Sequence, residues 1–237
     1  MSRFVIAVRG FLAALCLMPA AAVAAEPVKR VAVYVEPFYN SGATGQTPKV
    51  AVGKAFDAQL ASGKREDLLA VRDAIVAKPG TVTPMTMMVL AIRFYDAGLR
   101  DDAVFWFYAA KDRFITLSEV AVPNAPQLAQ AEDAVKNFAT LAGPIINGYA
   151  FCDLAKQKDI RQKALAWVEA NPYEVAFMTQ LPARGADRKA LLAAAVGNAK
   201  ANAAKERAYF DDPKTVETYY ATRKKNEADV KYCWKSE

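Results

Sequence analysis

Signals that start and stop helices recur along this chain, at intervals of roughly ten to twenty residues. Thr83–Pro84 and Asp212–Pro213 each place a capping side chain before a proline suited to the first helical position. Ser62–Gly63 and Pro79–Gly80 are typical of places where a helix ends. One short segment, 31–35, has the alternating, β-branched character of a strand. The pattern predicts an all-α protein: a single helical domain of about seven to nine helices built from antiparallel hairpins, preceded by a short extended N-terminal segment.

The expected helices are separated by glycine, proline or polar residues. One of them is distinctive, because Ala103–Ala110 is an unbroken run of eight apolar or aromatic residues. Such a run covers every side of a helix, so the helix that carries it should be central and buried on most faces. The expected helical stretches are 50–61, 65–77, 84–97, a fourth from 101, then 127–141, 144–156, 160–170, 187–210 and 213–232.

The first 25 residues have the three-part layout of a secretory signal peptide. Arg3 and Arg9 give a positive start, an uncharged and mostly apolar stretch follows, and small residues favour cleavage after Ala24 or Ala25. The alternative is a membrane anchor, but the 16 uncharged residues 10–25 are fewer than the roughly 20 that a spanning helix needs. We therefore expect a cleaved signal (1–25), an extended leader or loop (26–49) and an all-helical domain (50–237). The mature protein should be periplasmic or secreted, with no membrane span after cleavage.

Two cysteines, Cys152 and Cys233, remain once the signal is removed, since Cys16 lies within it. An even number of cysteines in an oxidising compartment indicates a disulfide, which would tie the C-terminal segment to the middle of the chain. Closing so long a loop stabilises a chain by roughly 4 kcal/mol on chain-entropy grounds. Two free thiols are the alternative.

The chain has no histidine. Its absence excludes Ser-His-Asp and Cys-His catalysis, together with imidazole ligands for zinc and most transition metals. The sequence has no nucleophile elbow and no phosphate-binding glycine loop, so it predicts no catalytic residue, no cofactor and no metal site. Four adjacent acid pairs remain, each near an expected helix start or on a helix surface, where acids favourably meet the helix dipole or solvent. They are Glu66–Asp67, Asp101–Asp102, Glu132–Asp133 and Asp211–Asp212.

The net charge is a weaker constraint. The chain carries 31 basic and 25 acidic residues, and removal of Arg3 and Arg9 with the signal leaves 29 against 25, a net charge of +4. This mild excess suits solubility and acidic partners. Nucleic acid is not expected, because an exported protein leaves the compartment that holds it and the sequence has no basic stripe interleaved with aromatic residues.

Small, aromatic and glycine residues follow one another at fixed offsets between Met87 and Ala110. They are Leu90, Ala91, Phe94, Gly98, Ala103, Phe107 and Ala110. In this order they resemble a single tetratricopeptide repeat, in which small residues let two helices approach and aromatic residues fill the groove between them. Met87 and Ile115 depart from the pattern, standing where that family has tryptophan and proline. The resemblance implies protein or peptide binding on a helical surface, whereas simple core packing is the other explanation for the aromatic run.

Three functions from different classes are open. The first is an exported helical protein-binding module without catalytic activity, an adaptor or an immunity-type inhibitor whose partner is another envelope or secreted protein. Its surface would be an exposed apolar patch bordered by Arg93, Lys111 and Arg113. The second is a carboxylate-dependent cell-envelope hydrolase, which requires two acids in different environments, one with a perturbed pKa. The third is a small-molecule binder with a pocket between helices, lined by the aromatic helix and the methionines 85, 87 and 88. The sequence favours the protein-binding module.

Overall fold

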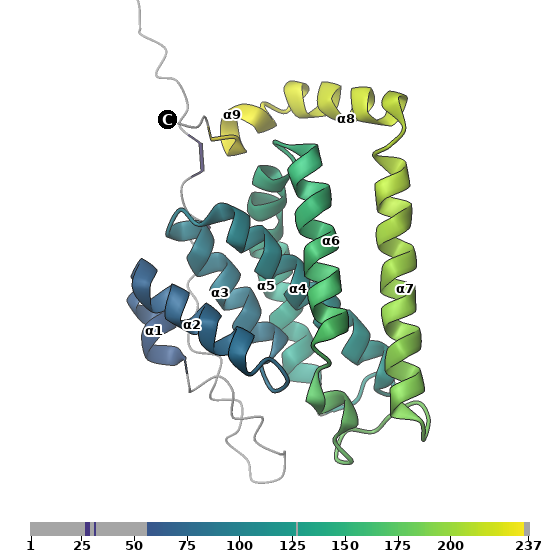
Figure 1. Cartoon of the computed structure of the whole chain (residues 1–237). Helices are drawn as coiled ribbons and strands as arrows, with labels where there is room; N and C mark the ends of the chain where they lie inside the picture. The colour runs from purple at the N-terminus through teal and green to yellow at the C-terminus, as the bar shows by residue number, and fades with distance from the viewer. Residues whose placement is uncertain (1–26, 29–30, 32–55, 127, 235–237) are drawn as a thin grey trace, which may run out of the picture.

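The computed structural model describes residues 27–28, 31, 56–126 and 128–234. Within these residues the protein is all-α, as predicted, with nine α-helices, a short 3-10 helix, an isolated β-bridge between Ala121 and Ala183, and no strand (Figure 1). No described helix is long and apolar enough to cross a membrane. The elements are α1 (Asp57–Ser62), α2 (Arg65–Ala77), α3 (Pro84–Asp96), α4 (Arg100–Val120), α5 (Ala129–Ala150), α6 (Leu154–Ala170), the 3-10 helix η2 (Glu174–Phe177), α7 (Arg188–Tyr209), α8 (Pro213–Lys225) and α9 (Ala228–Tyr232).

The hairpin of α3 and α4 forms the centre of the core. Thr83 caps α3 as predicted, because its Oγ1 accepts a hydrogen bond from the Thr86 amide at 3.1 Å, and Pro84 takes the first helical position. The chain turns at Gly98, whose φ of +82° suits a residue without a side chain. Six residues of the repeat-like pattern are buried, as close helix packing requires: Leu90, Ala91, Phe94, Ala103, Phe107 and Ala110. Kinship with tetratricopeptide repeats stays a prediction.

The helix α4 is central, as its apolar run predicts. It packs against α3, α5, α6 and α7. Trp106 and Phe107 are buried, and Phe105 meets Trp106 and Trp167 edge to face, with ring centroids 5.3 Å and 6.4 Å apart. Since Trp167 belongs to α6, these rings fill the space between α4 and α6.

One long helix, α5, replaces two predicted ones. The sequence predicts a break at Pro144, between helices at 127–141 and 144–156, and this prediction is wrong: α5 continues through Pro144 to Ala150. A proline inside a helix removes one backbone hydrogen bond and crowds the preceding turn. On either side of it, however, Ala142 and Ile146 are completely buried in the core. Their burial offsets the local cost, because most helical stability in proteins comes from tertiary packing.

Side-chain caps set the later helix starts. In each case an aspartate carboxylate accepts a hydrogen bond from the amide three residues along the chain: Asp153 at α6, Asp187 at α7 and Asp212 at α8. The first of these caps explains why α6 begins at Leu154 and not at the predicted residue 160. The starts of α7 and α8 agree with the prediction to within one residue.

The predicted final helix, 213–232, is broken into α8 and α9. The break lies at Glu227, whose φ of +53° is left-handed and bends the chain between α8 and α9. As a result α9 packs against α5 and brings Cys233 to Cys152. The approach is close, because a Cβ added at Gly148 on α5 would lie 2.5 Å from the Tyr232 ring. Glycine at 148 therefore allows α9 to dock.

Residues next to the predicted cleavage site contact α3 and α9. The Val28 amide donates to the Lys231 carbonyl at 2.6 Å, and the Val28 carbonyl accepts from the Tyr95 hydroxyl at 3.0 Å. The Val31 amide donates to Asp96 Oδ1 at 2.8 Å. The predicted signal peptide and the rest of the predicted leader, 26–49, lie outside the described residues.

Candidate functional site

A pocket of about 470 Å³ lies beneath α8, which crosses the end of the helical bundle from α7 to α9 (Figure 1). We call it the α8 pocket. Its size falls within the range of about 300–1,000 Å³ that is typical of small-molecule sites. The lining residues come from α4 to α9 and the turns at the ends of α5 and α8: Tyr108, Lys111, Asp112, Pro144, Asn147, Gly148, Phe151, Arg161, Glu206, Tyr219, Thr222, Arg223, Asn226 and Ala228.

Few contacts hold α8 over this pocket. Arg223 is its one buried residue, and among the described helices α8 packs closely against α9 alone. Tyr219 adds ring contacts with Phe151 and Phe210, at centroid distances of 5.4 Å and 5.2 Å. The helix is therefore a cover attached through individual side chains and not through a hydrophobic core.

A chain of hydrogen bonds forms one wall. The Tyr108 hydroxyl donates to Asn147 Oδ1 at 3.1 Å and accepts from Gln157 Nε2 at 3.2 Å. Gln157 Nε2 also donates to Glu206 Oε1 at 3.1 Å. Burial raises the pKa of Tyr108 to about 12, so its hydroxyl stays protonated at neutral pH. Tyr108, Asn147 and Glu206 line the pocket, so this wall offers a ligand fixed polar groups from three helices.

Arg161 joins the two acids of the pocket. Its Nη1 and Nη2 donate to the two carboxylate oxygens of Asp112, Nη2 to Oδ1 at 3.0 Å, and its Nε lies 3.6 Å from Glu206 Oε2. Desolvation raises the pKa of Asp112, although the hydrogen bonds from Arg161 oppose the change. Burial lowers the pKa of Arg161, but Asp112 outweighs that effect and the net shift is upward. Arg161 and Glu206 also line a smaller cavity of about 230 Å³ between α6 and α7.

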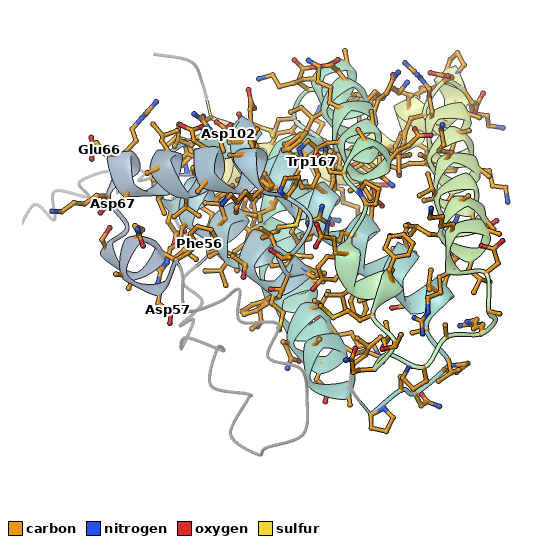
Figure 2. The ribbon with its side chains drawn as sticks, turned by 60° about the horizontal axis from the view of Figure 1, so that its bottom comes forward. Phe56, Asp57, Glu66, Asp67, Asp102 and Trp167 are labelled. Carbon is orange, nitrogen blue, oxygen red and sulfur yellow. A yellow bond between two sulfur atoms is a disulfide. The ribbon has the colours of Figure 1, made fainter. Side chains whose placement is uncertain are left out.

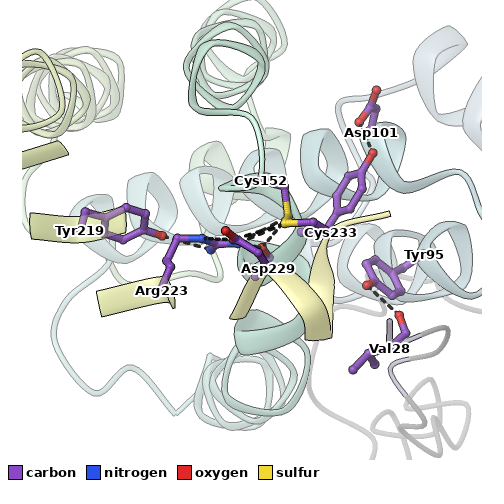
Figure 3. The surroundings of a disulfide bond; sticks show 10 residues. Val28, Tyr95, Asp101, Cys152, Tyr219, Arg223, Asp229 and Cys233 are labelled. Atoms are coloured by element: carbon purple, nitrogen blue, oxygen red, sulfur yellow. Dashed lines mark hydrogen bonds and ion pairs between the residues drawn. A yellow bond between two sulfur atoms is a disulfide. The ribbon is translucent and has the colours of Figure 1, made fainter. Parts of the chain in front are cut away.

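The predicted disulfide between Cys152 and Cys233 is present, with Cα atoms 5.5 Å apart and a sequence separation of 81. Arg223 lies against it: Nη2 is 3.4 Å from each Sγ and donates to the Gly148 carbonyl at 3.1 Å (Figure 3). The Arg223 Nε donates to Asp229 Oδ1 at 2.8 Å. One side chain thus connects the cover of the pocket, α5 and the disulfide.

One group of candidate metal ligands is found among the described residues. Cys152, Asp229 and Cys233 place their ligand atoms within 4.8 Å of one another. The two sulfurs are bonded to each other, and thiolates, not disulfides, bind metal. The guanidinium of Arg223 beside them further disfavours a cation. In this form the group is not a metal site.

The three cations predicted to border a partner surface do not lie together. Lys111 lines the α8 pocket, and Arg93 is half-buried on α3. The prediction is wrong for Arg113, which is completely buried on the opposite side of α4 from Lys111. Its two terminal nitrogens donate hydrogen bonds to three backbone carbonyls, those of Pro79, Val82 and Asn171, at 2.7–3.0 Å.

The apolar surface expected beside those cations is dispersed. Among the described residues, the large exposed apolar side chains lie on six different elements: Val76, Ile115, Leu141, Phe177, Tyr209 and Val230. The methionines considered for a pocket lie elsewhere, since Met87 and Met88 are completely buried in the core and none of the three lines the α8 pocket.

The adjacent acid pairs have the structural positions that the sequence predicts. Glu66 and Asp67 occupy the first turn of α2, and Asp101 and Asp102 that of α4; Figure 2 shows Glu66 and Asp67 at the outer end of α2, away from Asp102. Asp101 accepts from the Tyr149 hydroxyl at 2.8 Å. Of the remaining pairs, Glu132 bonds Lys136, Asp211 bonds Lys158 and Asp212 caps α8.

Sequence reasoning missed the residues that build the pocket. Asp112 and Arg161 are 49 positions apart, and Arg223 and Gly148 are 75 apart, so no local motif connects them. The one local signal is Asp112, an acid two residues beyond the apolar run of a central helix. An acid in this position must find a partner when it is buried.

Comparison with known proteins identifies a relative. The chain is 34% identical over 225 residues to an uncharacterized protein of Haemophilus influenzae, and the alignment covers 95% of this chain and 87% of the relative. The chain therefore belongs to the same protein family as that relative. No family model matches the sequence, and no solved structure matches it at a significant level. Because the alignment spans nearly the whole chain, the kinship concerns the whole helical domain and not one hairpin.

Proposed function

We propose that this chain is an exported helical protein, without catalytic activity, that binds a small molecule in the α8 pocket. The observation that carries the proposal is the convergence of polar side chains from five helices on one cavity of about 470 Å³: Tyr108, Asn147, Arg161, Glu206 and Arg223. Ligand pockets typically combine such a volume with a few fixed polar groups. The signal-like N-terminus supports export, as does the disulfide, since disulfides persist in oxidising compartments.

The geometry gives less support to the protein-binding module that the sequence favours. That function calls for an apolar patch bordered by Arg93, Lys111 and Arg113, yet Arg113 is buried and the exposed apolar side chains are dispersed. The repeat-like residues of α3 and α4 serve core packing. Binding of an envelope or secreted protein remains a proposal. The described residues form no defined surface for such a partner.

One observation favours the carboxylate-dependent hydrolase as a second candidate. Asp112 is a buried acid with a raised pKa, and the more exposed Glu206 shares its pocket. However, both oxygens of Asp112 accept hydrogen bonds from Arg161, so a proton taken up by Asp112 would displace one of them. Hydrolysis of cell-wall glycan or peptide that is abolished by Asp112→Asn would favour this candidate over simple binding.

Two threonines of α8 allow a matched test of ligand binding. Thr222 lines the pocket and Thr218 does not, while both are exposed and both donate a hydroxyl hydrogen bond to the carbonyl four residues earlier. Thr222→Trp should fill the pocket, whereas Thr218→Trp should leave it open. We expect thermal melts against a panel of small envelope metabolites to find compounds that stabilise the wild type and T218W but not T222W. A panel without a stabilising compound, or equal stabilisation of T222W, would contradict the proposal.

A further inference from the structure

We infer that the ligand of the α8 pocket is a small organic anion, whose charged group meets Lys111 and whose apolar part lies against Phe151 and Tyr219. The inference rests on the proposed function and names the chemical class that the site selects.

The charges of the pocket are unequally matched. Arg161 is paired with both acids of the lining, Asp112 and Glu206. Arg223 is paired with Asp229, which lies outside the lining. Lys111 is half-buried and makes no hydrogen bond or ion pair with any residue in the part of the chain that the structure describes. Its ammonium is therefore the charged group of the pocket lining that has no ion-pair partner.

This arrangement selects against cations. A positively charged ligand would need a carboxylate, and the two in the lining are already held by Arg161. To free one of them, the ligand would have to leave a largely buried guanidinium without its partner, which is unfavourable. A negatively charged ligand meets the Lys111 ammonium and displaces no existing ion pair.

The lining also has an apolar part. Phe151 and Tyr219 have ring centroids 5.4 Å apart, and Pro144 and Ala228 add further carbon surface. Such a wall gives an inorganic anion nothing to contact, whereas a carboxylate with a hydrocarbon or aromatic group would bury that group there. The chemistry is therefore that of a small carboxylate with an apolar portion.

Three isosteric probes separate charge from shape. Benzoate, benzamide and benzamidinium have similar size and carry negative, zero and positive charge. Calorimetric titration of the mature, disulfide-bonded protein should show benzoate binding at least tenfold more tightly than benzamide, and no binding of benzamidinium. Lys111→Met keeps the length of the side chain and should weaken benzoate binding about tenfold while leaving benzamide unchanged. Lys136→Met, which removes the same charge from the exposed surface of α5, should have no effect.

The outcomes distinguish this inference from the proposed function. The pocket is a ligand site but the anion inference is wrong if T222W abolishes binding and either of two results is found. One is that all three probes bind equally well, and the other is that K111M leaves benzoate binding unchanged. If benzoate does not bind the wild type, the anion inference is wrong, and the metabolite panel alone decides the proposed function. If benzoate binds T222W and the wild type alike, it binds outside the α8 pocket and both are contradicted.

Discussion

The guanidinium of Arg223 lies directly against Cys233, with Nη2 3.4 Å from Sγ, and it is equally close to the Sγ of Cys152. A positive charge at this distance favours the thiolates that form when the disulfide is reduced. Asp229, bonded to the same guanidinium at 2.8 Å, has the opposite effect on the sulfurs. Arg223 therefore raises the reduction potential of the disulfide, and Asp229 lowers it.

Substitution of these two residues should move the reduction potential to opposite sides of the wild-type value. Arg223→Met removes the stabilising cation and leaves Asp229 beside the sulfurs, so the potential should fall by about 30 mV, a tenfold change in equilibrium constant. Asp229→Asn should raise it by a similar amount. Equilibration with glutathione buffers, followed by thiol trapping, measures both values. Shifts of the same sign in the two variants would contradict the argument.

Removal of the disulfide should destabilise the protein without unfolding its core. The cross-link joins positions separated by 81 residues, for which chain entropy gives roughly 4 kcal/mol. It fastens α9 to the end of α5, whereas α3 and α4 lie outside that connection. Urea denaturation of the Cys152→Ala/Cys233→Ala double variant should show a loss of about 4 kcal/mol. In native-state hydrogen exchange, α8 and α9 should open locally at a lower free energy than α3, whose opening free energy should fall by no more than the global loss of about 4 kcal/mol. Equal opening free energies in α9 and α3 would count against this prediction.

Arg113 should contribute more to stability than any surface cation. Its guanidinium donates to three carbonyls and lies 4.7 Å from the Trp167 ring centroid, and burial lowers its pKa to about 10. Arg113→Met fills similar space but removes the donor to all three carbonyls, although the Pro79 carbonyl keeps the Val82 amide as a partner. We expect a cost of about 3 kcal/mol. Arg72→Met, at a more exposed position, should change stability by less than about 0.5 kcal/mol. Equal urea midpoints for the two variants would contradict the structural role of Arg113.

The part of the fold that depends on local chemistry could be predicted from the sequence. Thr83 and Asp212 cap helices through amides three residues away, so the signal and its outcome lie in one turn. The prediction fails where distant packing decides, as at Pro144, which stays inside α5 because its neighbours are buried. It fails again at Glu227, because a left-handed break at a non-glycine residue has no clear local signature.

The α8 pocket could not be predicted from the sequence either, because contacts between residues far apart in the chain build it. Its ion pair joins Asp112 to Arg161 from different helices, and its cover depends on the contact of Arg223 with Gly148. The disulfide could be predicted, since compartment and cysteine count bear on it directly. The sequence predicts an exposed Arg113 because a cation in an amphipathic pattern is ordinarily exposed. Its burial depends on three backbone carbonyls that come together only in the folded chain.

Tyr108 should make stability depend on pH in the alkaline range. Burial raises its pKa from 10.0 to about 12, so between these values the unfolded chain loses the phenolic proton while the folded chain keeps it. The folded state then binds more protons, and stability falls as pH rises through this window, by about 2–3 kcal/mol in all.

Tyr108→Phe should cost about 1–2 kcal/mol near pH 9, because its hydrogen bonds with Asn147 and Gln157 are lost. Urea midpoints measured up to about pH 12 should show this difference shrinking and then changing sign as the wild type loses its advantage. Arg113, whose lowered pKa acts in the opposite direction, is common to both proteins and cancels in the difference. Parallel pH profiles would mean that the Tyr108 hydroxyl titrates as it does in the unfolded chain, which its buried position between two hydrogen-bond partners argues against.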